Sequence, residues 1–446
     1  MIRSGLIVLC IICAARGDQL EQYIEQGLKN NLALQQKNFS YQKSIQALNE
    51  ARGAYLPSLD ILARYSRAGG GRTFEMPIGD IANPIYEALN LPVRLENVVV
   101  PFLRPEEQET KLRLIQPIFQ PAIHYNYKMK TEMKEIEQLA ILVYKRYLIS
   151  EIKTAYFNYM MTIQVIKLLN ETRTLLEENV RVSEHLYQNE KVTKDAVYRA
   201  QAELSALDQN LAESDNRLVQ SRAYFNFLIN RPLETTILID DTTGFHEPVN
   251  AGYDQLCEEA WRNREELKQM GHVLSAVSFH GKIARSAYLP GISGVVDYGI
   301  QGEQYRFTGN DDYWMASLVL QWNLFKGFQD QAKRQQIKLD HDEKELQYRE
   351  LRRKITLEVR QIYDRCQAVL KKIKASEQRE KSARSSFIIV QKKYREGMAS
   401  QIEFLDARST LTDAQVKNIL AGFEYQVSRS ELERVLAGYP LEEPDE

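Results

Sequence analysis

The pattern of hydrophobic and polar positions divides the chain into two similar halves. In each half, apolar residues recur at helical spacing, then alternate as in strands, and then return to helical spacing. The first half predicts a helix, two strands and two further helices, at residues 18–56, 58–67, 109–119, 121–189 and 194–230. The second half predicts the same elements in the same order, at 254–288, 291–302, 312–325, 327–396 and 400–437. We therefore expect a duplicated fold.

The junction between helix and strand is the clearest part of the duplication. Residues 51–57 read Ala-Arg-Gly-Ala-Tyr-Leu-Pro, and residues 284–290 read Ala-Arg-Ser-Ala-Tyr-Leu-Pro. Pro57 and Pro290 each stop the preceding helix, because the residue before a proline is pushed out of the α region. The long helices also correspond, since residues 187–204 align with residues 394–411 at one constant offset.

These correspondences predict the organisation of the whole chain. We expect a signal peptide, a first structural repeat, a linker segment, a second structural repeat and an acidic tail, at residues 1–17, 18–230, 231–253, 254–438 and 439–446. The stretch 68–108 carries Gly69-Gly70-Gly71 and several prolines, so it is predicted to be a long exposed loop.

The predicted helix lengths suggest how each repeat packs. A helix from Pro121 to about Asn189 would be on the order of 100 Å long. The two shorter helices of each repeat together match that length, so they can lie end to end and antiparallel to the long one. The strands then fall at one end of the repeat, and the turns at 190–194 and at Gly397 fall at the other.

The beginning of the chain indicates export. Arg3, the apolar run from Leu6 to Ala15 and the small residues around Arg16 form a signal-peptide pattern. No later stretch reaches the ~20 apolar residues of a spanning helix. An exported protein of this kind is periplasmic, secreted or an outer-membrane β-barrel. Cys257 and Cys366 lie in predicted helices, where two ordinary thiols are favoured over a disulfide.

The charge balance bears on possible partners. The chain has 58 basic and 60 acidic side chains, a net charge of −2, and cleavage of the leader would remove two arginines. A slightly acidic protein is a poor match for nucleic acid, so no nucleic-acid partner is expected.

The strand at 312–325 resembles an outer-membrane strand. Trp314, Leu318 and Trp322 fall on one face, and polar residues such as Ser317 and Gln321 fall on the other. The two tryptophans are eight residues apart, about 26 Å along a strand, which is close to the height of an apolar membrane band with aromatic residues at both interfaces. A half-buried soluble sheet shows the same alternation, so the pattern alone leaves both interpretations open.

Strand number favours an oligomer if the strands span a membrane. Four strands cannot close a barrel, and an open edge in lipid leaves backbone groups unpaired. Two copies would supply eight strands with an interior filled by side chains, whereas three would supply twelve strands with room for a lumen. The helices would then form a hollow cylinder.

At this point the sequence resembles the TolC family of outer-membrane efflux and secretion channels. The resemblance covers essentially the whole mature chain. It rests on the two Ala-Tyr-Leu-Pro junctions, on Asn323-Leu324-Phe325-Lys326-Gly327-Phe328, on Tyr394-Arg395-Glu396-Gly397 and on Ile402-Glu403-Phe404-Leu405-Asp406-Ala407. The fold it implies is mainly α, with duplicated antiparallel helical hairpins in a trimeric periplasmic α-barrel and four strands per chain in a shared twelve-stranded outer-membrane β-barrel. It also implies a homotrimer in outer-membrane lipid that docks to a periplasmic adaptor and an inner-membrane pump or exporter.

The resemblance assigns candidate residues at the periplasmic entrance. Glu403 and Asp406 match the acidic entrance positions of the family, and residues three apart share a helix face. Three-fold symmetry would gather their carboxylates into a ring that favours cations. Tyr394 and Gly397 match a possible gate turn. The sequence departs from the family pattern at three positions near the turns, which leaves the gate-locking contacts unassigned: Glu190, Ala196 and Ala399.

Two other function classes compete with a channel. An enzyme is disfavoured, because the six histidines show no metal-binding spacing and no nucleophile elbow or phosphate loop occurs; no cofactor is expected. A soluble periplasmic coiled-coil scaffold would explain the helices but would leave the Trp-bearing strands without a purpose. The exported substrate and the transporter class cannot be read from the sequence.

Overall fold

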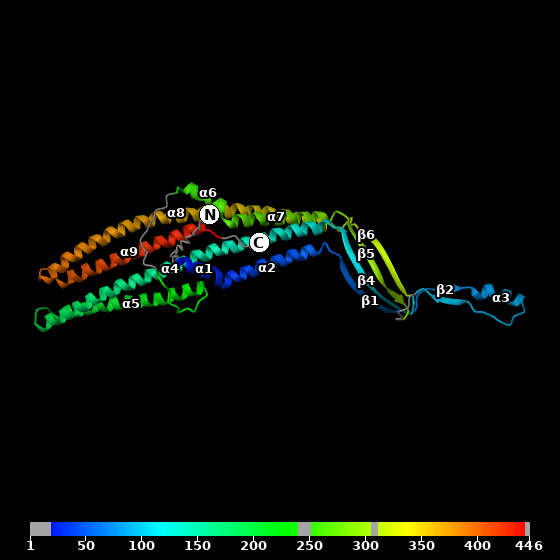
Figure 1. Cartoon of the computed structure of the whole chain (residues 1–446), viewed down its shortest axis with the longest axis horizontal. Helices are drawn as coiled ribbons and strands as arrows, with labels where there is room; N and C mark the ends of the chain where they lie inside the picture. The colour runs from blue at the N-terminus through cyan, green and yellow to red at the C-terminus, as the bar shows by residue number, and fades with distance from the viewer. Residues whose placement is uncertain (1–18, 240–250, 305–310, 442–446) are drawn as a thin grey trace, which may run out of the picture. The chain divides into compact units, whose positions relative to one another are not determined.

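The computed structural model describes residues 19–239, 251–304 and 311–441. The predicted signal peptide and part of the predicted linker and tail lie outside these residues. The chain divides into two compact units, each assembled from separate stretches of sequence (Figure 1). The first unit takes residues 1–44, 134–274 and 343–446, and the second takes 45–133 and 275–342.

Helices dominate the described chain, as the sequence predicts. Their bounds are Gln19–Asn30 for α1, Leu32–Gly53 for α2, Pro121–Gln188 for α4, Lys194–Leu228 for α5, Tyr253–Asn263 for α6, Glu265–Ser286 for α7, Gln329–Arg395 for α8 and Gln401–Val435 for α9. In the part of the chain that the structure describes, none of the helices is long and apolar enough to cross a membrane.

Three clusters of buried side chains hold the helices of the first unit together. One joins α1, α2, α4, α5 and α9, a second joins α6, α7, α8 and α9, and a third joins the hairpins α4–α5 and α8–α9. Helix α9 takes part in all three, and Tyr425 on it is fully buried. Cys257 and Cys366 are buried free thiols in the second cluster.

Four helix ends repeat one capping geometry at equivalent positions of the two repeats. After α4, α5, α8 and α9, a residue adopts a left-handed conformation, with φ of 56° at Glu190, 53° at Asn230, 73° at Gly397 and 54° at Ala437. The next residue in each case donates its N–H to the carbonyl five positions earlier, at 2.8–2.9 Å. This is the Schellman motif, for which glycine is the usual residue. Gly397 meets that preference and Asn230 is the common alternative, whereas Glu190 and Ala437 carry a conformational cost.

The first helix of each repeat is interrupted, which corrects the expectation of single helices over 18–56 and 254–288. Asn31 separates α1 from α2, where its side chain donates to the carbonyl of Leu228 at 2.8 Å and accepts from the N–H of Leu34 at 3.0 Å. Arg264 separates α6 from α7 with an extended backbone, and its guanidinium binds Glu358. Both interrupting residues are buried, so tertiary contacts of a polar side chain override local helix propensity at each break.

The second unit contains a four-stranded antiparallel sheet in the order β1-β4-β5-β6. The strands span Ser58–Arg67 for β1, Glu106–Phe119 for β4, Gly291–Gly302 for β5 and Asp312–Gln321 for β6. Four strands in one sheet confirm the expected strand content. β6 ends before Trp322, so the expectation of a strand over 312–325 is wrong at its far end. β1 and β6 are the edge strands.

The stretch between β1 and β4 is structured, so the expectation of a plain loop over 68–108 is wrong. It contains a short ribbon of β2, Thr73–Met76, paired with β3, Val98–Pro101. Helix α3, Ile78–Ala88, lies between these strands in the sequence. We call residues 69–104 the excursion. It lies between β1 and β4 in the chain, and Figure 1 labels its elements β2 and α3.

Both helix-to-strand junctions have the same local structure. α2 ends at Gly53 and β1 begins directly after Pro57, while α7 ends at Ser286 and β5 begins directly after Pro290. In each junction the tyrosine and the leucine before the proline donate their N–H groups to carbonyls three residues earlier. The repeated sequence therefore encodes a repeated turn.

Candidate functional site

The turn between α8 and α9 holds the predicted gate residues. Gly397 is the left-handed residue of the turn, and its N–H donates to the carbonyl of Tyr394 at 3.1 Å. The ring of Tyr394 stacks on Phe404 with 4.8 Å between ring centroids. Phe404 in turn lies 5.7 Å from the ring of Phe387 on α8. Within one chain, Tyr394 is thus a packing residue that ties the turn to the hairpin.

The predicted acidic pair lies in the first turns of α9. Ser400 is the N-cap of the helix, and its hydroxyl accepts the N–H of Glu403 at 3.3 Å. The carboxylate of Glu403 accepts the N–H of Ser400 at 3.2 Å, which completes a capping box. Glu403 and Asp406 are both exposed, while Phe404 and Leu405 between them are buried. The two carboxylates therefore point to solvent from one rigid helix end.

The beginning of α9 is also bound to the other hairpin. The side-chain amide of Gln401 donates to the hydroxyl of Ser183 on α4 at 3.0 Å and to the carbonyl of Ala196 on α5 at 2.9 Å. The contact of Ala196 with the other hairpin is therefore made by its backbone carbonyl and not by its side chain. The acidic pair is held in place relative to both hairpins by these bonds.

A groove of about 970 Å³ lies between the ends of the two hairpins. Its walls come from α4, from the α4–α5 turn, and from α8 and α9, and they include Leu186, Val192, Gln391, Phe404 and Ala399. Ala399 is one of the predicted departures from the family pattern, and its small side chain leaves room in this groove. The lining of the groove is thus a mixture of apolar and polar side chains.

Further along α9, Arg408 is a buried cation that the sequence pattern did not single out. Its side chain hydrogen-bonds the hydroxyl of Thr172 on α4 and lies over the ring of Phe387, 5.4 Å from the centroid. Burial lowers the pKa of this guanidinium. In the sequence, Arg408 follows Asp406 by two residues, and such a run of charged residues usually lies on a solvated helix face. The sequence therefore did not predict the burial of Arg408.

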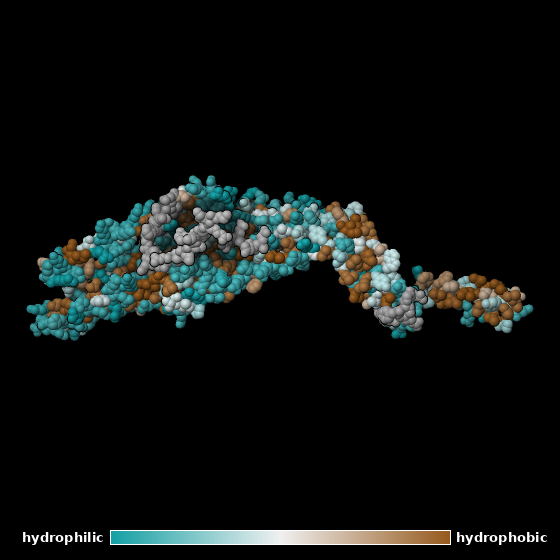
Figure 2. Space-filling view, in the orientation of Figure 1, coloured by the Kyte–Doolittle hydropathy of each residue, from teal (hydrophilic) through white to brown (hydrophobic). Residues whose placement is uncertain are grey.

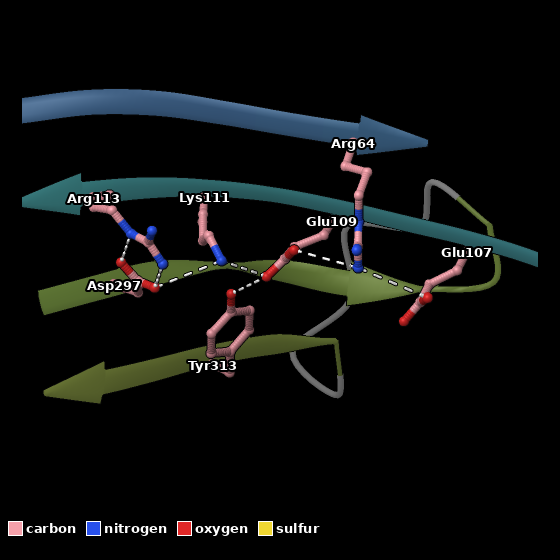
Figure 3. A network of polar contacts seen from close by, with 7 residues as sticks. All are labelled: Arg64, Glu107, Glu109, Lys111, Arg113, Asp297 and Tyr313. Carbon is pink, nitrogen blue, oxygen red and sulfur yellow. Dashed lines mark hydrogen bonds and ion pairs between the residues drawn. The ribbon is translucent and has the colours of Figure 1, made fainter. Parts of the chain in front are cut away.

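The sheet carries a network of charged side chains on one face (Figure 3). Asp297 on β5 is fully buried and accepts two hydrogen bonds from Arg113 on β4, at 2.8 and 2.7 Å. Lys111 lies 3.6 Å from Asp297 and 2.7 Å from Glu109. Glu109 also accepts the hydroxyl of Tyr313 on β6, at 2.7 Å.

Arg64 on β1 extends the same network across the sheet. Its guanidinium lies 3.6 Å from Glu109 and 3.8 Å from Glu107 (Figure 3). Charged side chains of both signs from β1, β4 and β5, together with Tyr313 from β6, therefore line this face of the sheet. The alternation of polar residues along 58–67 and 109–119 indicates such a face in the sequence, but the pairing partner Asp297 lies 184 residues from Arg113.

The opposite face of the sheet is apolar and uncovered. The register places Ile61, Leu112, Tyr298 and Trp314 side by side across the four strands. Ile61 is 74% exposed and Trp314 is 75% exposed. Hydrophobic residues gather over the strands in Figure 2. An isolated soluble sheet would not leave such side chains in water, because contiguous exposed apolar surface marks an interaction site or a membrane surface.

Trp322, the second predicted interface aromatic, follows β6 and contacts the helix-to-strand junction before Pro290. Its indole N–H donates to the carbonyl of Tyr288 at 3.1 Å. In the first repeat, Gln116 occupies the equivalent position and its side-chain amide donates to the carbonyl of Tyr55 at 3.0 Å. Trp314 and Trp322 thus differ in role: the first is free on the apolar face, and the second also fixes the turn before Pro290.

A four-stranded sheet together with long antiparallel helical hairpins is also the fold of several solved outer-membrane channels. The solved OprN outer-membrane channel has a TM-score of 0.79 at 16% identity, covering 94% of this chain and 90% of that chain. The CmeC outer membrane channel of Campylobacter jejuni has a TM-score of 0.78 at 17% identity, covering 94% and 86%. The outer membrane protein VceC of Vibrio cholerae has a TM-score of 0.76 at 15% identity, covering 94% and 96%.

The family model for outer membrane efflux proteins matches residues 256–438, which is most of the second repeat. Together with the fold of the whole chain, this match confirms the resemblance to a channel family predicted from the sequence. Among curated proteins, no sequence matches this chain significantly.

Proposed function

We propose that the chain is one subunit of a homotrimeric outer-membrane channel that passively conducts substrates delivered by an inner-membrane transporter through a periplasmic adaptor. The observation that carries this proposal is the sheet, whose uncovered apolar face lies opposite a face lined with paired charges. Such a sheet suits a wall with lipid on one side and water on the other.

The open edges of the sheet support a shared barrel. β1 and β6 are edge strands, and an unpaired edge in hydrocarbon costs several kcal/mol for each unsatisfied backbone group. β1 of one subunit can pair with β6 of the next, and three subunits then close twelve strands around a lumen. In that barrel the network of Arg113, Asp297 and Lys111 faces the lumen, and Trp314 and Trp322 lie toward the two membrane interfaces.

The two repeats, residues 18–230 and 254–438, would each supply one long helix and its antiparallel partners to a periplasmic α-barrel, with 231–253 as the linker between them. The equivalent caps at Glu190 and Gly397 support this division. We assign the ends of the hairpins to the periplasmic entrance, with Glu403 and Asp406 as an acidic ring. The groove beside Phe404 would receive a helical hairpin of the adaptor.

Extraction and mass measurement test the proposal together. Membranes from cells that express the native protein are washed with salt and carbonate and are then treated with a mild detergent. We expect release only by detergent, followed by a mass of three chains in light scattering with strand content retained. Release by carbonate would support a soluble periplasmic scaffold, and a monodisperse monomer that retains its strands would refute the shared barrel.

A further inference from the structure

The excursion is folded with polar groups inside and aliphatic groups outside. Asn97 accepts the N–H groups of Gly79 and Asp80 at 3.1 and 3.2 Å. Asn83 and Leu95 exchange two hydrogen bonds of 2.9 and 2.8 Å. These bonds hold α3 against the returning chain and use the polar atoms that would otherwise face solvent.

The outer surface of the excursion is apolar. One stripe of α3, continued by its C-cap residue Leu89, carries Ile78, Ile81, Ile85 and Leu89, which are 40%, 67%, 55% and 64% exposed. These positions lie within one face of a helix, and Asp80 and Glu87 lie on the opposite face. The β2–β3 ribbon adds Phe74 and other exposed apolar residues, and hydrophobic residues cover this part of the chain in Figure 2. The stripe lacks a partner in the described chain.

The charges of the excursion disfavour a lipid surface as that partner. Helices that lie in a membrane interface carry lysine or arginine on their polar face, whereas α3 has Asp80 and Glu87 and no basic residue. Within the described residues, the exposed Arg94, Glu87 and Glu96 take part in no ion pair of the single chain. The exposed charges of the excursion thus include both signs and show no excess of basic residues that would favour an anionic lipid surface.

The connection to the sheet brings the excursion of a second copy within reach. Residues 68–72 connect β1 to β2 and residues 102–105 connect β3 to β4, so each link spans at most about 20 Å when extended. β1 is an edge strand. A chain that pairs with this edge brings its own excursion to within two such links, and short tethers give a high effective concentration.

We propose that the excursions of neighbouring subunits pack on one another through the Ile78, Ile81, Ile85 and Leu89 stripe. This inference rests on the proposed trimer and adds to it a second contact between subunits, separate from the strands and the helical hairpins. It explains why a segment with this much exposed aliphatic surface folds around polar contacts.

Cysteine crosslinking of the full-length protein in native membranes tests the contact. The background is favourable because Cys257 and Cys366 are buried, and burial raises the pKa of the Cys366 thiol to about 11. Ile81→Cys and Ile85→Cys are compared with Asp80→Cys and Glu87→Cys, using a short bismaleimide. We expect crosslinked dimers for the two stripe variants and no crosslinked dimers for the two variants on the opposite face.

A second variant tests the packing and separates the possible failures. Adding Ile81→Asp to Leu89→Cys should abolish the crosslink of Leu89→Cys if the apolar stripe makes the contact. The mass of each variant is measured in detergent. A trimer without stripe crosslinks would overturn this inference alone, as would strong quenching of an Ile81→Trp variant by brominated lipid in vesicles. Absence of any oligomer would overturn both the proposed function and the contact.

Discussion

Neutralising the two carboxylates at the start of α9 should reduce cation selectivity without disturbing the helix end. Glu403→Gln keeps a side-chain oxygen that can accept the N–H of Ser400, and glutamine is a normal partner in a capping box. Asp406→Asn changes an exposed side chain of nearly the same size. The double variant therefore removes charge while it keeps the cap.

The expected size of the effect follows from the Coulomb energy. Two carboxylates per chain give six in the proposed trimer. At about 10 Å from each of them, a cation gains roughly 2.5 kcal/mol in water, which screening at 0.1 M salt reduces to about 0.9 kcal/mol. That energy corresponds to an enrichment of cations by about fivefold. At ~1 M salt the Debye length is about 3 Å, and the enrichment should vanish.

Reversal potentials in planar bilayers under a salt gradient measure this selectivity. We expect the double variant to lose most of the cation preference at low salt and to match the parent protein at high salt. Ser400→Ala is the matched control, because it removes the N-cap hydroxyl, at about 1 kcal/mol, and leaves both charges. Unchanged selectivity of the double variant at low salt would place Glu403 and Asp406 on a solvated outer surface and refute the entrance ring.

Three further predictions concern stability. Glu190→Gly removes a left-handed non-glycine residue and should stabilise the end of α4 by about 1 kcal/mol, measured as slower hydrogen exchange there; faster exchange would contradict the reasoning. Asp297→Asn weakens the two hydrogen bonds from Arg113, whose side chain is 32% exposed, and should cost about 1.5–3 kcal/mol, seen as a lower melting temperature of the oligomer. Burial raises the pKa of Glu266, but hydrogen bonding and the charge of Arg264 outweigh it and hold this pKa below its usual value. The resulting stability is present above about pH 4.5 and is lost as pH falls through the lowered pKa. Glu266→Gln should therefore reduce the loss of unfolding free energy at acid pH, measured as the free energy of unfolding against pH.

The parts of the fold that could be predicted are those set by local signals. Pro57 and Pro290 keep the residue before each of them out of the α region, and Gly397 adopts a left-handed conformation without the steric cost of a side chain. Glu190 lies in the same conformation as Gly397, yet no local signal marks it. Its position could be found only from the alignment of the two repeats.

The parts that could not be predicted depend on contacts between distant segments. The helix breaks at Asn31 and Arg264 exist because their buried side chains bind Leu228 and Glu358, and neither residue is a helix breaker by itself. The folded structure of the excursion could not be predicted for a related reason. Its glycines and prolines indicate a loop, while its order comes from side-chain bonds of Asn83 and Asn97 to backbone 12 to 18 residues away.

The charge pattern of the sheet bears on where a channel of this kind would select its ions. In the network, Arg64, Lys111 and Arg113 are balanced by Glu107, Glu109 and Asp297, and each contacts a neighbour of opposite sign. Paired charges of opposite sign produce a weak field at a distance, so this face adds little net potential to a lumen. The carboxylates of Glu403 and Asp406 have no such partners within one chain in the described structure, and copies brought together by symmetry would add their fields. Selectivity for charge should therefore depend on the helix ends, while the charges of the sheet pair with one another across β1, β4 and β5.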